Sequence, residues 1–193
     1  MNIQLILPKE MVWIPKTSIH PLYFLAGPVL GGDDWQKDAI EMIARKHPGS
    51  QIVCPCRWEA DHPLYQYRQI GILPEKYNDE HTHITSSQTL WERYYMRHAS
   101  LRGCLLFWLP KESTTKPRPI DTGPYGRDSY GEQGEWRYRL SQNPSLGVVL
   151  GGDSDFSGLR VIAKNWRDLN GSDFPIYQTL EETVDAAVAK ATR

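Results

Sequence analysis

Short apolar runs alternate with longer amphipathic segments along most of the chain. A short apolar run bounded by glycine or proline is typical of a buried strand, whereas apolar residues that recur every three or four positions are typical of a helix. Strands are therefore predicted at residues 21–26, 51–54, 103–109, 146–150 and 174–177. Helices are predicted between Trp35 and Pro48 and at residues 90–101, 129–140, 156–169 and 180–191.

This alternation predicts a doubly wound α/β fold, with a mostly parallel five-stranded sheet and helices on both faces, as in Rossmann-like and flavodoxin-like domains. The length favours a single domain over residues 1–193. Residues 1–20 are expected to form an N-terminal extension that adds one or two edge strands between Ile3 and Pro15. Ligands of such folds bind beyond the carboxyl ends of the strands. The loops expected to converge there are residues 27–34, 55–86, 110–131 and 151–156.

An acidic cluster stands where the helix after the central strand is expected to begin. The spacing Ser129-x-x-Glu132 matches a capping box, which predicts a helix start at that point after a loop at residues 112–131. The positive end of a helix favours ionised carboxylates nearby, here those of Asp128, Glu132 and Glu135. Two interpretations are open: Glu132 is a capping residue and Glu135 a solvated one, or a carboxylate of this cluster faces a cleft as a nucleophile.

The charges nearly cancel, with 22 basic and 23 acidic residues, which argues against nucleic acid or an anionic membrane as the partner. A small or neutral ligand fits this balance better. The sequence has no apolar run long enough to span a membrane and no pattern typical of a secretory signal. Three cysteines are too few for a disulfide framework, so we expect a reducing, cytoplasmic setting.

Two weaker patterns indicate neither a metal nor a cofactor. Cys54-Pro-Cys56 with His81 and His83 lacks the two-residue gap and the second pair that are typical of zinc sites. The glycine-containing loop 27–32 matches neither the dinucleotide-binding fingerprint nor a Walker loop. Three basic side chains of the long loop are expected either to be solvated or to bind a phosphorylated substrate: Lys116, Arg118 and Arg127.

Several motifs occur in a characteristic order: Leu22-Tyr-Phe-Leu-Ala-Gly-Pro28 with Asp34-Trp-Gln36, then Trp91-Glu92 ahead of Leu106-Phe-Trp-Leu-Pro110, and then Gly131-Glu-Gln-Gly-Glu-Trp136. In order and spacing they resemble the nucleoside 2-deoxyribosyltransferase family, particularly its divergent second branch. The resemblance covers residues 21–151, and its most specific part is the glutamate-bearing helix entry after the central strand.

The resemblance implies an enzyme that exchanges nucleobases on 2'-deoxyribonucleosides. It implies a covalent deoxyribosyl-glutamate intermediate, net retention at the anomeric carbon, no cofactor and a homo-oligomer. Glu135 matches the nucleophile of the family, and Tyr23 matches a tyrosine that supports it. Asp128 is nearest to an aspartate that binds the sugar or protonates the base. Glu92 stands where the family has another acid, on the helix before the central strand.

The loop after the first buried strand supplies most of the candidates for substrate contact. Trp35 could stack on a base and Gln36 could pair with its edge, whereas Trp91 and Trp108 are large aromatics of the kind that more often pack in a core. The candidate substrate-binding residues are Gly27, Asp34, Trp35, Gln36 and Arg127.

Two other functions stay open on sequence grounds. One is an N-glycoside hydrolase of nucleosides or deoxynucleoside monophosphates, in which water replaces the acceptor base. The other is a catalytically silent nucleotide-binding module, because one fold serves many functions.

Overall fold

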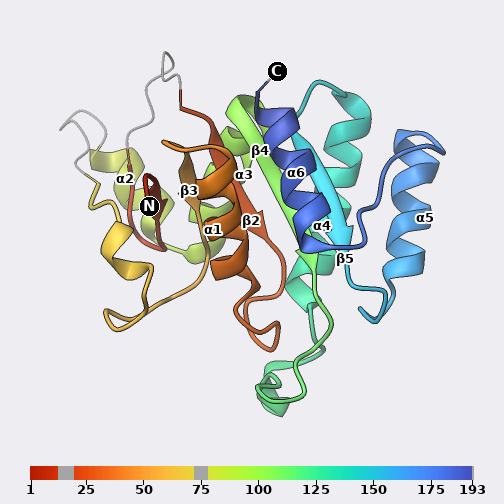
Figure 1. Ribbon diagram of the computed structural model, residues 1–193, viewed down its shortest axis with the longest axis horizontal. Helices are drawn as coiled ribbons and strands as arrows, with labels where there is room; N and C mark the ends of the chain where they lie inside the picture. The colour runs from red at the N-terminus through yellow and green to blue at the C-terminus, as the bar shows by residue number, and fades with distance from the viewer. Residues whose placement is uncertain (13–19, 72–77, 193) are drawn as a thin grey trace.

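The core of the molecule is a five-stranded parallel sheet (Figure 1). The computed structural model describes residues 1–12, 20–71 and 78–192, and within them the strand order is β1-β3-β2-β4-β5. The strands are β1 (Gln4–Ile6), β2 (Leu22–Ala26), β3 (Gln51–Val53), β4 (Gly103–Leu109) and β5 (Val148–Gly152). The predicted doubly wound α/β fold is therefore confirmed.

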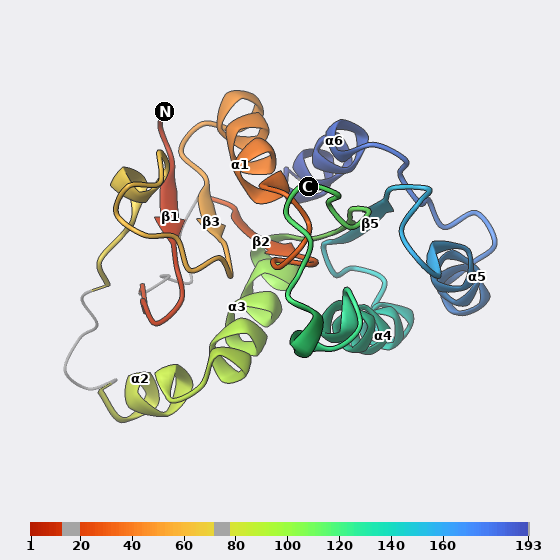
Figure 2. The same ribbon diagram turned by 90° about the horizontal axis from the view of Figure 1, so that it is seen from below.

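Helices cover both faces of the sheet (Figure 2). One face packs against α1 (Trp35–Lys46) and α6 (Leu180–Ala191). The opposite face packs against α3 (Gln88–Arg102), α4 (Arg127–Gln142) and α5 (Leu159–Asn170). No helix of the described residues is long and apolar enough to cross a membrane.

Shorter helical segments lie outside these two layers. α2 (Asn78–Thr85) precedes α3 and contacts it, within the stretch 55–86 that was predicted as a loop. Single-turn 3-10 helices occupy Tyr65–Tyr67 and Ile120–Thr122. The second of these belongs to the segment after β4, which extends beyond the carboxyl end of the sheet (Figure 1).

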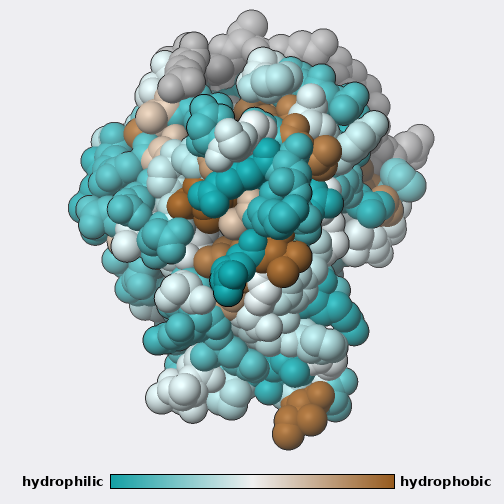
Figure 3. Space-filling model, turned by 90° about the vertical axis from the view of Figure 1, so that its right-hand side faces the viewer, coloured by the Kyte–Doolittle hydropathy of each residue, from teal (hydrophilic) through white to brown (hydrophobic). Residues whose placement is uncertain are grey.

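The amphipathic pattern of α5 shows how the sequence sets the layers. Leu159, Ile162 and Trp166 recur at helical spacing and are buried against the sheet, whereas Val161 and Leu169 are exposed. Figure 3 shows this side of the molecule, on which small apolar areas are interrupted by hydrophilic side chains.

Side chains along the central strand β2 point alternately to the two layers, as they must in an extended chain. Phe24 and Ala26 pack in the core beneath α3 and α4. Tyr23 and Leu25 pack in the core beneath α1 and α6. The position of a residue in this alternation therefore decides which face of the sheet its side chain packs on.

The connections that leave β2 and β4 run over opposite faces of the sheet. The chain passes from β2 to β3 through α1 on one face, and from β4 to β5 through α4 on the other face. The connections therefore diverge at the carboxyl ends of β2 and β4, the position at which doubly wound sheets leave a crevice for ligands.

Of the edge elements that were predicted, the one at residues 174–177 differs from the structure and the N-terminal one agrees with it. The strand predicted at residues 174–177 is reduced to one parallel bridge between Gly151 and Tyr177. Pro175 has no backbone N–H, so this segment cannot continue the ladder. The predicted N-terminal edge strand is confirmed: β1 pairs with β3 at the other edge and is the fifth strand of the sheet, while Pro15 lies outside the described residues.

The start of α4 also differs from the prediction, with consequences for the acidic cluster. The helix begins at Arg127, inside the predicted loop 112–131, and its N-cap is Gly126 with φ 70°. No side chain caps it, so the predicted capping box of Ser129 and Glu132 was wrong. Ser129 lies in the first turn instead, and Glu132 lies in the second.

Gly27 ends β2 at a point where a side chain has no space. Its φ is 151°, and a Cβ there would lie 2.0 Å from the carbonyl oxygen of Trp108. We expect Gly27→Ala to lower the free energy of unfolding by about 2–4 kcal/mol through backbone strain and overpacking. The measurement is the denaturant midpoint at unchanged slope. Gly131→Ala is the matched control: a Cβ there meets nothing within 4 Å, so the helix should gain about 0.5–1 kcal/mol. Equal midpoints for the two variants would contradict this account.

Candidate active site

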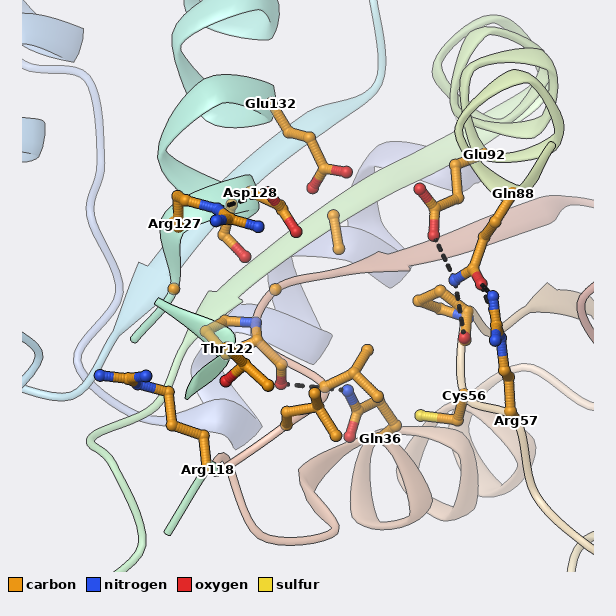
Figure 4. A pocket seen from close by; sticks show the side chains of 18 of the residues that line it. Gln36, Cys56, Arg57, Gln88, Glu92, Arg118, Thr122, Arg127, Asp128 and Glu132 are labelled. Atoms are coloured by element: carbon orange, nitrogen blue, oxygen red, sulfur yellow. Dashed lines mark hydrogen bonds and ion pairs between the residues drawn. The ribbon is translucent and has the colours of Figure 1, made fainter. Parts of the chain in front are cut away.

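A cavity of about 670 Å³ opens at the crevice between β2 and β4 (Figure 4). Its walls are the loop after β2, the segment after β3, the first turns of α3 and α4, and the end of the loop after β4. This volume lies in the range typical of small-molecule sites. Among the described residues the predicted loop 151–156 does not line the cavity, since Phe156 packs instead against Tyr125 and Tyr130.

Three carboxylates converge on this cavity from two helices. Asp128 and Glu132 lie on α4 and Glu92 lies on α3, and Figure 4 shows their side chains extending into the space between the helices. Residues four apart share one face of a helix, so the observed start of α4 at Arg127 brings Asp128 and Glu132 to the same wall.

Glu135, the residue that the resemblance assigns as nucleophile, does not line the cavity. Its carboxylate forms an ion pair with Arg139 one turn further along α4, with 2.7 Å between Glu135 Oε1 and Arg139 Nη2. Three residues add about 4.5 Å along a helix axis, which takes Glu135 away from the carboxyl end of the sheet. The structure therefore places Glu132, not Glu135, at the position from which a glutamate can reach a bound ligand.

The environment of the cavity raises the pKa values of both glutamates, Glu132 and Glu92. Burial raises the pKa of Glu132 to about 8, with further contributions from Glu92, Asp128 and Glu135, while Arg93 opposes the increase. Burial also raises the pKa of Glu92, and Asp128 adds to this, while a hydrogen bond from Gln88 and the charge of Arg57 oppose it. Burial, with a smaller contribution from the neighbouring carboxylates, therefore keeps a proton in the cavity at neutral pH.

Asp128 lies at the rim of the cavity rather than in its interior. Its side chain is 85% exposed, and its Oδ1 is 3.3 Å from Arg127 Nε. Arg127 also lines the cavity and is 62% exposed. An aspartate that is so exposed and adjacent to a cation is well placed to bind polar groups of a ligand.

Tyr23 cannot support the nucleophile as the resemblance implies. Its side chain points to the α1 layer, because it alternates with Phe24 and Ala26 on β2. Its hydroxyl forms a hydrogen bond of 2.7 Å with His47 Nδ1 just after α1. Tyr23 is therefore a buried structural residue on the opposite face of the sheet from α3 and α4.

The predicted loop residues divide into those that line the cavity and one that supports it. Gly27, Asp34 and Gln36 line it. Gln36 Nε2 donates to the carbonyl oxygen of Pro28 at 3.3 Å, and Trp35 Nε1 donates to the same oxygen at 2.9 Å. The prediction that Trp35 stacks on a base is thus wrong: its indole is buried under the loop and fixes the course of the loop.

The other two tryptophans considered for stacking lie in the core, as large aromatics usually do. Trp91 is buried beneath the N-terminal segment and donates to the carbonyl oxygen of Glu10 at 2.8 Å. Trp108 on β4 packs with the core beneath α1 and α6.

Residues just after β3 contribute to the site although the sequence did not single them out. Arg57 and Trp58 line the cavity. The Trp58 ring stacks on His62 with centroids 3.8 Å apart, and His62 Nε2 lies 3.2 Å from Asp34 Oδ2. Gln88, in the first turn of α3, links Arg57 to Glu92. The sequence does place Arg57 and Trp58 directly after a predicted strand and Gln88 near a predicted helix start. Ligand sites of parallel sheets lie at such positions.

The weak metal pattern is not assembled in the described part of the chain. Cys54 and Cys56 are buried free thiols, and no group of three or more potential ligands occurs among the described residues. The side chain of His81 lies outside the described residues. Of the three basic loop residues, Arg118 and Arg127 line the cavity, whereas Lys116 is exposed outside it.

No protein-family model matches this chain, and no curated protein sequence is similar to it. The fold and the site together define its class: a doubly wound α/β protein with an acidic cavity at the carboxyl ends of β2 and β4.

Proposed function

We propose that this protein is a nucleoside 2-deoxyribosyltransferase, which exchanges nucleobases on 2'-deoxyribonucleosides through a covalent intermediate on Glu132. One observation carries the proposal: Glu132 and Glu92 enter the same cavity from different helices, and both have raised pKa values. A carboxylate with a neighbouring carboxylic acid is the pair that cleavage of a glycosidic bond requires.

In the first step an oxygen of Glu132 attacks the anomeric carbon of the donor. The bond from that carbon to the base nitrogen breaks, and its electron pair stays with the base. The proton of Glu92 passes to the departing base, which leaves as a neutral molecule. The carboxylate stabilises the positive charge that develops on the sugar and then traps the sugar as an ester.

In the second step a nitrogen of the acceptor base attacks the same carbon from the face that the first base left. The ester bond to Glu132 breaks, and the carboxylate is regenerated. The acceptor's proton returns to Glu92. Two displacements at one carbon give net retention, and the pair is restored for another cycle.

Of the two acids near Glu132, Glu92 is the better proton donor. It is half-buried and its pKa is raised, mainly by burial. Asp128 is exposed at the rim next to Arg127, so we assign it to binding of the sugar or of the outer edge of the base. The proposal therefore takes Glu92 as the acid and Asp128 as a binding residue.

The pH dependence of kcat/KM is expected to be bell-shaped. Between the raised pKa of Glu92 and about pH 8 the two glutamates hold one proton between them. The proton rests mainly on Glu132, whose pKa is the higher, and the active form is the less populated one in which it has moved to Glu92. Below that range both are protonated and no nucleophile exists. Above about pH 8 both are ionised and the departing base receives no proton. Initial rates across the range check this, and a profile that stays flat through pH 8 would contradict it.

Chromatography of a donor nucleoside with a free acceptor base tests the proposed reaction. Deoxyadenosine with cytosine, and thymidine with adenine, should each yield the new nucleoside and the released base. Free sugar as the main product would favour a hydrolase. Tight nucleoside binding without turnover for any pair of bases would favour a silent binding module, and either result would overturn the proposal.

A second candidate, hydrolysis of deoxynucleoside monophosphates, is favoured by the arginines of the cavity. Arg118 and Arg127 line it, and Arg118 Nε, which is buried without a hydrogen-bond partner among the described residues, lies 3.6 Å from Glu112 Oε1 in an ion pair. Arginine is well suited to bind phosphate. Faster sugar release from monophosphates than transfer from nucleosides would identify this activity.

The proposal also includes a homo-oligomeric assembly in a reducing cytoplasm. Buried free thiols at Cys54, Cys56 and Cys104 are compatible with such a compartment. Light scattering of the purified protein decides the assembly state.

A further inference from the structure

A chain of hydrogen bonds ends on the carboxyl group of Glu92. Arg57 donates from Nε and Nη2 to Gln88 Oε1, at 2.8 and 2.5 Å. Gln88 Nε2 donates to Glu92 Oε1 at 2.7 Å and to the carbonyl oxygen of Pro55 at 3.3 Å. Gln88 and Glu92 are one turn apart on α3, whereas Arg57 and Pro55 follow β3. The chain therefore joins two walls of the cavity.

Arg57 determines which way the amide of Gln88 faces. A guanidinium has only donors, so the group that it contacts must be the amide oxygen. The amide nitrogen then faces Glu92 and Pro55, and each of its two N–H groups has an acceptor. Because a flipped amide would oppose N–H to N–H at Arg57, the arrangement has one stable orientation.

The amide of Gln88 in turn distinguishes the two oxygens of Glu92. Oε1 accepts the N–H of Gln88, so a proton on Glu92 resides on Oε2. Figure 4 shows one oxygen of Glu92 joined to Gln88 and the other on the side that faces Asp128 and Glu132. The free oxygen is thus the one that can reach a bound ligand.

We propose that Gln88 and Arg57 are positioning residues, which orient Glu92 so that Oε2 delivers its proton to the departing base and recovers a proton from the acceptor base. This inference rests on the proposed function. Neither residue exchanges a proton with the substrate. Gln88 holds the carboxyl group, and Arg57 holds Gln88.

The same contacts act on the protonation of Glu92. The charged groups that face Glu92 are Asp128 and Glu132 from α4 and Arg57 from the segment after β3. Burial and Asp128 raise the pKa of Glu92, while the Gln88 hydrogen bond and Arg57 lower it. Removal of the Gln88 amide therefore raises this pKa, and the acidic limb of the pH profile moves to higher pH.

The test compares wild type with Gln88→Met, which keeps the length of the side chain and removes the amide. We expect kcat to fall about 10–100-fold through loss of orientation, with KM for the donor little changed. The acidic limb of kcat/KM should move to higher pH. Arg57→Met should move the limb in the same direction with a smaller loss of kcat. Gln142→Met, at an exposed position on α4, is the matched control and should behave as wild type.

A measurement that does not depend on turnover separates this inference from the proposed function. In protein labelled with ¹³C at glutamate carboxyl carbons, the Glu92 signal is assigned by its absence from Glu92→Gln. It should titrate at higher pH in Gln88→Met than in wild type. An unchanged titration, or a loss of kcat with the acidic limb in place, would overturn the positioning role. Absence of transfer in wild type with a shifted titration would overturn the proposed function alone.

Discussion

Replacement of Glu132 by glutamine is expected to lower kcat/KM for base exchange by about 10³-fold or more. The amide has nearly the shape of the acid but cannot form the sugar ester or balance the developing positive charge. Glu132 is the glutamate of α4 that enters the cavity, so no neighbour on that helix can replace it as a nucleophile. Initial rates of new nucleoside formation measure the loss.

Glu135→Gln is the matched control, because it makes the same chemical change three residues further along the same helix. Glu135 is paired with Arg139 outside the cavity, so its loss should leave kcat/KM within a few-fold of wild type. The cost in stability should be about 0.3–0.5 kcal/mol, as for other pairs of this spacing. Since Glu135 contributes to the raised pKa of Glu132, the alkaline limb should move slightly to lower pH. An inactive Glu135→Gln with an active Glu132→Gln would contradict the assignment.

Replacement of Glu92 by glutamine is expected to lower kcat by about 10²–10⁴-fold, the usual contribution of a general acid. The loss should depend on the departing base, because a base that leaves readily as an anion needs less help from a proton donor. Donors with progressively more acidic bases should therefore recover part of the rate. The alkaline limb near pH 8 should also disappear, because the proton left in the pair is that of Glu132, and its loss creates the nucleophile instead of removing the acid.

Asp128→Asn serves as the comparison for Glu92→Gln. Asp128 is 85% exposed and lies next to Arg127, so its loss should mainly raise KM. If Asp128→Asn instead gave the larger loss of kcat, together with the dependence on the departing base, Asp128 would be the acid and the role assigned to Glu92 would be wrong.

The strands and helices of this protein are largely specified by local patterns. β4 was predicted with its observed bounds because its apolar run is continuous between Gly103 and Pro110. α6 was likewise predicted with its observed bounds, and the structure shows that a capping box of Thr179 and Glu182 begins it. By contrast, the segment 174–177 has the composition of a strand, but Pro175 leaves it with a single bridge.

The location of the site was predictable, but not the residues that face into it. A difference of three residues in the N-cap of α4, Gly126 instead of Ser129, separates a capping glutamate from one that lines a cavity, and no side chain caps the observed start. Whether Tyr23 faces α1 or α3 depends on the alternation along β2, which a resemblance in sequence does not reveal. The link from Arg57 through Gln88 to Glu92 joins distant segments and could not be found from local pattern.

Direct identification of the sugar-bearing side chain tests the central claim. A donor nucleoside is mixed with the enzyme without an acceptor base, the mixture is quenched rapidly in acid, and the protein is digested with trypsin. Cleavage after Arg127 and Arg137 gives a peptide of residues 128–137 that contains both Glu132 and Glu135. Fragmentation of this peptide by mass spectrometry should place a deoxyribosyl group on Glu132. A deoxyribosyl group on Glu135, or unmodified peptide under conditions in which the donor releases its base, would contradict the account.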